Sequence, residues 1–250
     1  MINKKMKIPI ICYHKVGLAE KGDSGQALFI KPFQFKLQMF IIKLLGYKTI
    51  NIDELLKYLK GEQISAKKPI FITFDDGYEN NYINAYPILK KMNLTVTICM
   101  CTGYIDKKGA IFENEKYIKG KIPGSYLTEE EIIEMSQNGI SFCSHGVNHF
   151  YMDELKGMSL ENEITESKEK LGKLLDKEII FFSYPYGRYN KKTIEALRNA
   201  GYSGAFTIKK GKVNKEDNPY ELKRLVIKGY NRMFNFLSTV EFLYKLLFFN

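Results

Sequence analysis

Two adjacent carboxylates, Asp75 and Asp76, end an apolar stretch of the sequence at residues 69–74. Ile, Phe and Thr dominate that stretch and favour an extended chain, and Gly77 permits a turn directly after it. In α/β folds catalytic groups gather at the carboxyl ends of parallel strands, because the following loops open there. Alone, Asp-Asp-Gly is typical of an exposed turn. At the end of a buried strand it becomes a candidate catalytic pair.

Two of the three histidines, His145 and His149, follow a second strand-like stretch at residues 140–144. Their spacing puts both rings on one side of a helical turn, and a loop tightened by Gly146 would also bring them together. Two imidazoles and one carboxylate make a three-ligand site with open positions, suited to Zn²⁺, Fe²⁺, Co²⁺ or Ni²⁺. A lone histidine would be an ordinary polar loop residue. The pair, combined with Asp-Asp at another strand end, predicts metal binding.

The elements that must position these residues alternate between strand and helix. Strands are predicted at residues 8–14, 47–50, 69–74, 94–101, 140–144, 179–183, 202–207 and 225–228. Helices are predicted at residues 32–45, 53–60, 79–92, 128–138, 159–176 and 190–200. Residues 102–126 have little periodicity and predict a long loop that shapes a substrate groove. This alternation predicts a parallel sheet, open or closed into a barrel, with functional loops at one end.

The length of the chain fits one α/β domain, and we predict a single domain over residues 1–250 that ends in a closing helix at about 233–249. No stretch reaches the ~20 apolar residues that span a bilayer. The basic residues 1–7 precede an apolar run that is too short for a signal peptide. We therefore expect a cytoplasmic protein, with peripheral membrane attachment as the alternative.

The distribution of charge argues against a nucleic-acid-binding protein, and the positions of the cysteines argue against disulfides and a cysteine zinc site. The net charge is +10, but the lysines are spread along the chain without a dense basic arm, so no nucleic-acid partner is expected. Attraction to an anionic glycan or a membrane surface is a milder interpretation. The cysteines all lie in apolar stretches, which predicts reduced, buried thiols rather than disulfides or a zinc site. They are Cys12, Cys99, Cys101 and Cys143.

Together, three sequences resemble the motifs of the polysaccharide deacetylases of carbohydrate esterase family 4, which share the NodB homology domain. Residues 73–78 (TFDDGY) are similar to the first motif, 144–149 (SHGVNH) to the second and 182–187 (FSYPYG) to the third, in the same order and spacing. The Tyr13-His14 pair and the Tyr-Pro-Tyr-Gly sequence resemble most closely a variant group that includes deacetylases of poly-N-acetylglucosamine.

This resemblance implies a distorted (β/α)7-8 barrel as a single catalytic domain, and metal-dependent removal of an acyl group from an N-acetylated saccharide. It implies that Asp75 is the general base and that Asp76, His145 and His149 hold one divalent ion, zinc first and cobalt, nickel or iron as alternatives. The backbone N–H of Tyr186 would stabilise the oxyanion. Such an ion lowers the pKa of bound water toward ~7, so that a nearby carboxylate can take its proton at neutral pH.

The chain departs from the family pattern in three respects. Ser183 stands where many members have an arginine that pairs with the base, tryptophan is absent, and the Leu-x-His motif that supplies the general acid has no counterpart. We hypothesise that His14, the remaining histidine, faces the site as the acid; the alternative is that it only caps its strand. We also hypothesise that Arg224 supplies the charge that Ser183 lacks.

Two other functions remain open at this point. One is a sugar-binding pseudoenzyme that has lost its acid. The other is a deacylase of a lipid-linked sugar at the membrane surface, suggested by the Phe- and Leu-rich residues 234–249. That segment lacks the basic face of an interfacial helix, so docking on the barrel is favoured over membrane association. The sequence specifies neither the saccharide nor the oligomeric state.

Overall fold

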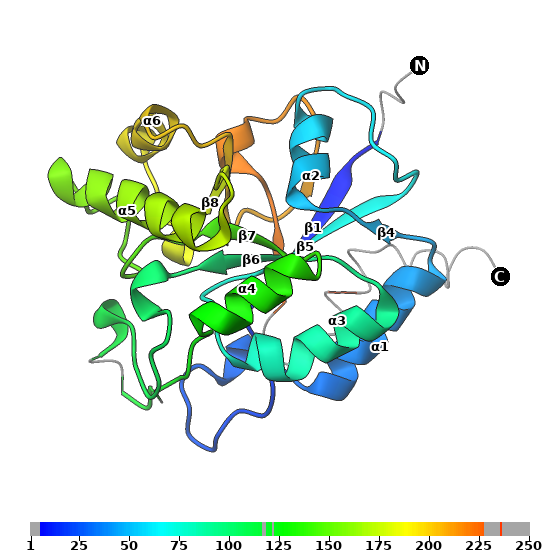
Figure 1. Ribbon diagram of the computed structural model, residues 1–250, viewed down its shortest axis with the longest axis horizontal. Coiled ribbons are helices and arrows are strands. Elements are labelled where there is room, and N and C mark those ends of the chain that lie inside the picture. The colour runs from blue at the N-terminus through cyan, green and yellow to red at the C-terminus, as the bar shows by residue number, and fades with distance from the viewer. Residues whose placement is uncertain (1–5, 117–118, 122, 228–235, 237–250) are drawn as a thin grey trace.

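The centre of the protein is a curled, mainly parallel sheet (Figure 1) in a computed structural model that describes residues 6–116, 119–121, 123–227 and 236. The strand order is β10-β1-β5-β6-β7-β8-β9, while β4 pairs with β5 and β11 with β1. The strands are β1 (Ile8–Tyr13), β4 (Lys48–Thr49), β5 (Pro69–Phe74), β6 (Thr97–Met100), β7 (Ser141–Ser144), β8 (Phe181–Ser183), β9 (Gly204–Phe206), β10 (Lys212–Val213) and β11 (Leu225–Val226). A separate pair consists of β2 (Lys15–Val16) and β3 (Phe29–Ile30).

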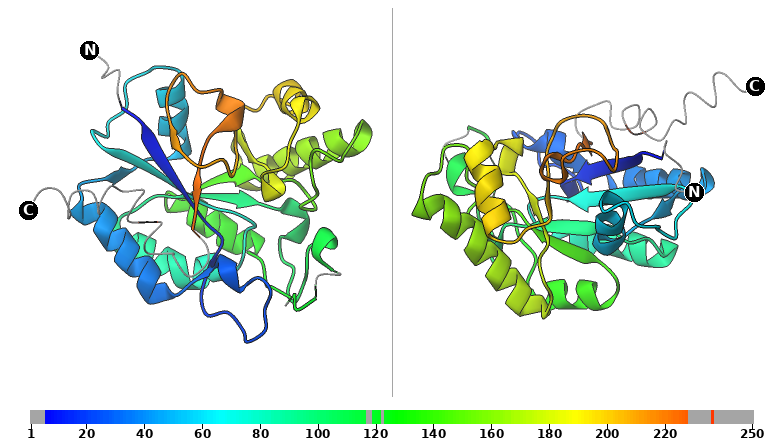
Figure 2. Two further views of the ribbon diagram at one scale, coloured as in Figure 1. Left: turned by 180° about the vertical axis from the view of Figure 1, so that it is seen from behind. Right: turned by 90° about the horizontal axis from the view of Figure 1, so that it is seen from above.

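Helices surround this sheet, with α1 packed against α3, and α5 packed against both α4 and α6 (Figures 1 and 2). They are α1 (Pro32–Leu44), α2 (Ile52–Leu59), α3 (Tyr86–Met92), α4 (Glu129–Gln137), α5 (Met158–Leu175) and α6 (Lys191–Asn199). A capping box starts α4 where the helix at 128–138 was predicted: the Thr128 hydroxyl accepts from the Glu131 N–H, and the Glu131 carboxylate accepts from the Thr128 N–H. Instead of kinking a longer helix, Pro87 lies in the first turn of α3, after a π-helical turn at Asn81–Ala85.

Side chains alternate between the two faces of the strands and form two buried clusters. On β5, Ile70, Ile72 and Phe74 belong to the larger cluster, which also contains the inner faces of the helices. Phe71, between them, belongs to the second cluster, where its ring stacks on Phe206 at a centroid distance of 5.6 Å. Asp75 directly follows β5, and by the same alternation its side chain lies on the face of the sheet that carries Phe71. The first aspartate is therefore next to the second cluster.

The last part of the described chain runs between β9 and β1 of the curled sheet. Leu222 pairs with Phe206 of β9, and Leu225 pairs with Ile11 of β1. In the view from behind in Figure 2, this orange segment runs beside the blue β1. Arg224 lies in the middle of the segment, and its side chain is buried. The fold is thus a single α/β domain with a curled half-barrel sheet, consistent with the distorted barrel that was expected.

The prediction that all four cysteines are reduced is wrong for one pair. The structure joins Cys99 and Cys143 in a disulfide. The two residues lie directly opposite each other in β6 and β7, where the strand register places their side chains on one face with Cα atoms 4.5 Å apart. Cys12 and Cys101 are free and buried, as predicted.

The predicted closing helix at 233–249 lies outside the described residues, except for Phe236, which is buried. None of the helices in the described part of the chain is both long enough and apolar enough to cross a bilayer. The cytoplasmic location stays a prediction.

Candidate active site

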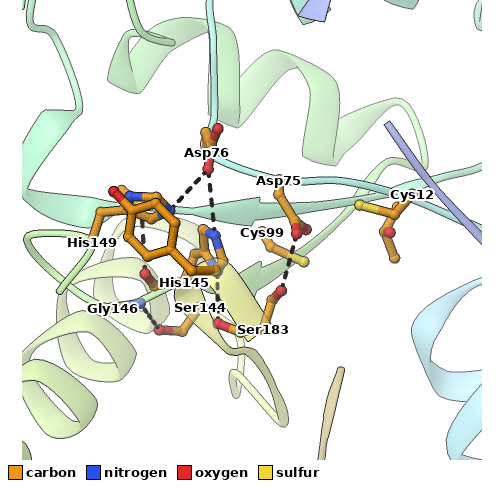
Figure 3. A network of polar contacts seen from close by, with 12 residues as sticks. Cys12, Asp75, Asp76, Cys99, Ser144, His145, Gly146, His149 and Ser183 are labelled. Carbon is orange, nitrogen blue, oxygen red and sulfur yellow. Dashed lines mark hydrogen bonds and ion pairs between the residues drawn. The ribbon is translucent and has the colours of Figure 1, made fainter. Parts of the chain in front are cut away.

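Asp76, His145 and His149 converge at the carboxyl ends of β5 and β7 (Figure 3). Asp76 Oδ1 lies 3.4 Å from Nε2 of His145 and 3.3 Å from Nε2 of His149, and all three side chains are almost fully buried. Two of the three, Asp76 (φ 78°) and His149 (φ 62°), have left-handed backbone conformations, which L-residues rarely adopt. Such strain persists only where the surrounding structure enforces it, as functional sites often do.

The loop between the two histidines is anchored to α5 by Glu163. One carboxylate oxygen of this buried residue accepts from the backbone N–H groups of Val147 (2.8 Å) and Asn148 (3.0 Å), and the other accepts from the Asn148 amide (2.6 Å). Ser144 Oγ accepts from the Gly146 N–H at 3.1 Å. The histidines are therefore held by a loop, not by a helical turn.

The side chains of Asp76, His145 and His149 offer ligand atoms that fit a divalent cation. The Nδ1 atom of His145 lies 2.6 Å from the Ser183 carbonyl, which can only accept, so His145 donates there. In the neutral ring its Nε2 lone pair then faces the Asp76 carboxylate oxygen, and a divalent cation between these two atoms would satisfy both. Donor separations of 3.3–3.4 Å are also what tetrahedral ligation with bonds of about 2.0–2.1 Å produces. The Cys101 sulfur lies within 4.8 Å of these donors, and its thiol donates to the His145 carbonyl.

Asp75 points away from Asp76, toward Ser183 (Figure 3). Arg224 makes a bidentate ion pair with it, Nη1 donating to Oδ1 (2.8 Å) and Nη2 to Oδ2 (2.7 Å). Arg224 also donates to Ser183 Oγ at 3.0 Å, and the serine hydroxyl donates to Asp75 at 3.2 Å. The hypothesis that Arg224 supplies the charge missing at position 183 is confirmed.

Burial and charge compete in setting the protonation of these groups. Burial acts to raise the pKa of Asp75, but the Arg224 guanidinium outweighs it and holds that pKa well below its usual range. Burial likewise acts to raise the pKa of Asp76, but the imidazoles of His145 and His149, when protonated, outweigh it and hold that pKa well below its usual range. Burial lowers the pKa of His149 to about 3, so this ring is neutral at pH 7, as a metal ligand must be.

His14 shares the same cavity as the aspartates. Its ring lies close to Asp75 and Cys12, with the nearest polar atoms of the three within 4.8 Å of one another. Within the described part of the chain, its buried Nδ1 has no hydrogen-bond partner. Burial lowers the pKa of His14, and the charges of Asp76 and Asp75 act against that effect. His14 therefore lines the site, as hypothesised, although its Nδ1 is itself buried.

Tyr186 lies beside the metal-site histidines, in a turn with φ 57°. Its ring packs on His149 at a centroid distance of 4.4 Å, and Phe112 packs on the same imidazole at 4.1 Å. Its hydroxyl donates to Glu115 at 3.3 Å. Phe112 and Glu115 both come from the 102–126 loop, which therefore does shape the site as predicted.

The cavity that these residues line has a volume of about 440 Å³ and contains His14, Asp75, Asp76, Glu115, His145, His149, Tyr186 and Arg224. The polysaccharide deacetylase family model matches residues 62–205, which is more than half of the chain and includes all three motifs. The chain belongs to the polysaccharide deacetylase family.

Several relatives match over most of the chain. It is 32% identical over 222 residues, 89% of the chain and 72% of the relative, to the Bacillus subtilis protein named "Putative polysaccharide deacetylase YxkH". It is 26% identical to the poly-beta-1,6-N-acetyl-D-glucosamine N-deacetylase of Staphylococcus epidermidis, over 78% of the chain and 67% of that enzyme. The structure of the Streptococcus pyogenes deacetylase PplD in complex with acetate superimposes with a TM-score of 0.81 at 29% identity, covering 94% of this chain and 98% of that one.

The structure brings all six predicted site residues to one cavity. Sequence reasoning missed Glu163, because a glutamate on an otherwise ordinary helix gives no sign that it bonds a distant loop. It also missed Glu115 and Lys121, which form an ion pair (2.5 Å) in the long loop. No periodicity or motif could have revealed either of them.

Proposed function

We propose that this protein is a metal-dependent hydrolase that removes N-linked acetyl groups from an amino-sugar-containing saccharide. The observation that carries the proposal is the convergence of Asp76, His145 and His149 on one position beside the ionised Asp75. A divalent ion held by these three residues would act as a Lewis acid on the acyl carbonyl and lower the pKa of bound water. Zinc suits this mixed nitrogen and oxygen donor set, with cobalt, nickel and iron as alternatives.

In this mechanism Asp75 is the general base. Because Asp76 serves as a ligand, it is not free to accept a proton, whereas its neighbour is. Arg224 keeps Asp75 ionised across the neutral range and fixes the direction of both carboxylate oxygens through two charge-assisted hydrogen bonds. The proton of the attacking water passes to Asp75 as the water oxygen bonds the acyl carbon.

His14 and Tyr186 complete the proposed machinery. His14 lines the cavity, where its protonated ring would deliver a proton to the leaving nitrogen as the carbon–nitrogen bond breaks. The backbone N–H of Tyr186 would stabilise negative charge on the acyl oxygen. The His14 role is tested by His14→Gln, which should lower kcat by about 10²–10⁴-fold and remove one limb of the pH–rate profile. Turnover near that of the unchanged protein would show that His14 is not the acid.

The substrate class is supported by the family and by its relatives. A poly-beta-1,6-N-acetyl-D-glucosamine N-deacetylase is among the proteins that share most of the chain, and an acetate complex is known for the structurally similar Streptococcus pyogenes deacetylase. We therefore propose an N-acetylated saccharide as the partner, without a nucleic-acid partner.

The test measures acetate release from a panel of N-acetylated oligosaccharides. The purified protein is assayed before and after removal of metal with a chelator, and again after refilling with Zn²⁺, Co²⁺ or Ni²⁺. We expect release to disappear with the chelator and to return with metal, and Asp75→Asn to abolish it while still binding metal. Metal binding without release from any saccharide would overturn the proposal in favour of a sugar-binding pseudoenzyme.

A further inference from the structure

Glu115 is a buried carboxylate in the active-site cavity that has no part in the proposed mechanism. It is 7% exposed and ends a short 3-10 turn, Glu113–Glu115, in the long loop between β6 and α4. A buried charge is costly unless it is paired, so its presence in the cavity wall requires an explanation.

Two contacts fix the position of the Glu115 side chain. Its Oε2 forms an ion pair with Lys121 Nζ at 2.5 Å, and the two side chains are 10% and 8% exposed. Its Oε1 accepts a hydrogen bond from the Tyr186 hydroxyl at 3.3 Å. One oxygen therefore holds Glu115 to its own loop, and the other reaches across the cavity to a turn 71 residues away in the sequence.

The turn at the other end of this hydrogen bond needs such support. Tyr186 has a left-handed backbone (φ 57°, ψ 7°), a conformation that costs a residue other than glycine of the order of 1–3 kcal/mol. Its ring packs against His149 and Tyr151, at centroid distances of 4.4 Å and 4.5 Å. The hydroxyl is the end of the side chain farthest from the backbone, so its bond to Glu115 fixes the direction of the whole ring.

We infer that Glu115 is a positioning residue: acting through the Tyr186 hydroxyl, it holds the 184–188 turn in place beside the metal-binding histidines. The kinetic part of this inference rests on the proposed function, in which the Tyr186 N–H binds the oxyanion. Because a misplacement of about 1 Å can cost ~10²-fold in rate, loss of this contact should lower kcat by about 10–100-fold. Substrate binding should change little, because Glu115 acts on the turn and not on the saccharide.

A double-mutant cycle with Glu115→Ala and Tyr186→Phe tests the inference. If Glu115 acts through the hydroxyl, Tyr186→Phe lowers kcat as much as Glu115→Ala does, and the double variant is no worse than either single one. Glu115→Gln should recover part of the loss, because its amide oxygen can still accept from the hydroxyl. The matched control is the Tyr82–Glu134 hydrogen bond (2.6 Å) between the π-helical turn and α4, where Tyr82→Phe should leave kcat unchanged. The inference would be overturned if the loss of kcat in the double variant equalled the product of the two single losses, or if the variants changed only KM.

Amide hydrogen exchange provides a readout that does not depend on activity. In Glu115→Ala the hydrogen-bonded amides of Tyr184, Gly187 and Arg188 should exchange at least about tenfold faster than in the unchanged protein, whereas those of β8 should not change. Unchanged exchange in that turn would show that Glu115 does not hold it. If the unchanged protein releases no acetate from any saccharide, the proposed function fails, and the exchange result alone decides the role of Glu115.

Discussion

Arg224 and Asp75 form the most consequential pair of charges in the molecule. They are 149 positions apart in the sequence, yet both are buried and their four terminal atoms meet in a bidentate pair. Removing one partner of such a pair leaves the other as an uncompensated buried charge, which is more costly than losing both. The pair therefore affects folding as well as the protonation of the proposed base.

We predict that Arg224→Met lowers the free energy of unfolding by about 3–5 kcal/mol, because Asp75 is then buried without its counter-charge. Adding Asp75→Asn should recover part of that loss, since the stranded carboxylate is removed. Urea unfolding at pH 7 of the two single variants and the double variant measures both effects. Strictly additive losses would show that the two residues do not stabilise each other.

Glu221, a surface residue, makes the stability of the folded protein depend on pH. Hydrogen bonds from Tyr189 (2.6 Å) and Lys209 (2.9 Å) lower the pKa of Glu221 to about 2, against an ordinary value of 4.5. A carboxylate with a lowered pKa in the folded state adds stability above its unfolded pKa and loses it as the pH falls toward the folded one. Because the group is about one-third exposed, solvent screening limits this contribution to about 1 kcal/mol at most.

The measurement compares unfolding of the wild-type chain with Glu221→Gln in urea. We expect the wild type to be the more stable at pH 7, and the difference to shrink as the pH falls from about 4.5 toward about 2. Glu195→Gln, on the exposed side of α6, is the control and should show no such trend. A difference that grows as the pH falls would contradict the sign of the lowered pKa.

At the scale of elements, α5 and the loop after β7 work as one unit. Glu163 reaches from the helix to three donors in the loop, Ser144 Oγ lies 2.6 Å from Ser167 Oγ, and the Thr102 N–H donates to the Gly146 carbonyl at 3.0 Å. The loop thus has little freedom, although it contains neither a helix nor a strand. Both histidines owe their positions to it.

We predict that Glu163→Ala weakens metal binding by about 10–100-fold, because groups that orient the ligands of a metal contribute that much to affinity. Glu166→Ala is the matched control, since Glu166 lies on the exposed side of the same helix and should leave affinity unchanged. Titration of the metal-free protein with Zn²⁺ in competition with a chelating dye measures both. Equal affinities for all three proteins would show that the loop holds the histidines without Glu163.

At the scale of the whole molecule, the closure of the sheet brings the parts of the site together. The segment from Leu222 to Val226 pairs with both β9 and β1, and it delivers Arg224 to the interior. Below Arg224 the interior is filled by aromatic rings, with Phe206 stacked on Phe71 (5.6 Å) and Phe181 (5.4 Å). The floor of the active site is thus part of the hydrophobic core.

Phe206→Ala should therefore lower the free energy of unfolding by about 3–5 kcal/mol, because it opens a cavity under the site. Phe40→Ala, in a helix where the side chain is 53% exposed, should cost no more than about 1 kcal/mol. Thermal unfolding of both variants provides the comparison. A similar loss at the two positions would show that the interior of the curled sheet does not depend on this ring.

The sequence by itself determined the alternation of strands and helices, the capping box of α4, and the polar residues that follow β5, β7 and β8. These follow from local physics, since periodicity, caps and turn residues act over a few positions. It also indicated the candidate metal site of Asp76, His145 and His149, because histidines and aspartates at strand ends are rare enough to stand out.

Only the tertiary structure decided which distant groups would meet. The anchoring by Glu163, the Glu115–Tyr186 bond and the Cys99–Cys143 disulfide all join residues from different elements. Such contacts depend on strand register and on the closure of the sheet, and these are set by the packing of the whole core. The residues next to each of these positions in the sequence therefore do not indicate its distant partner.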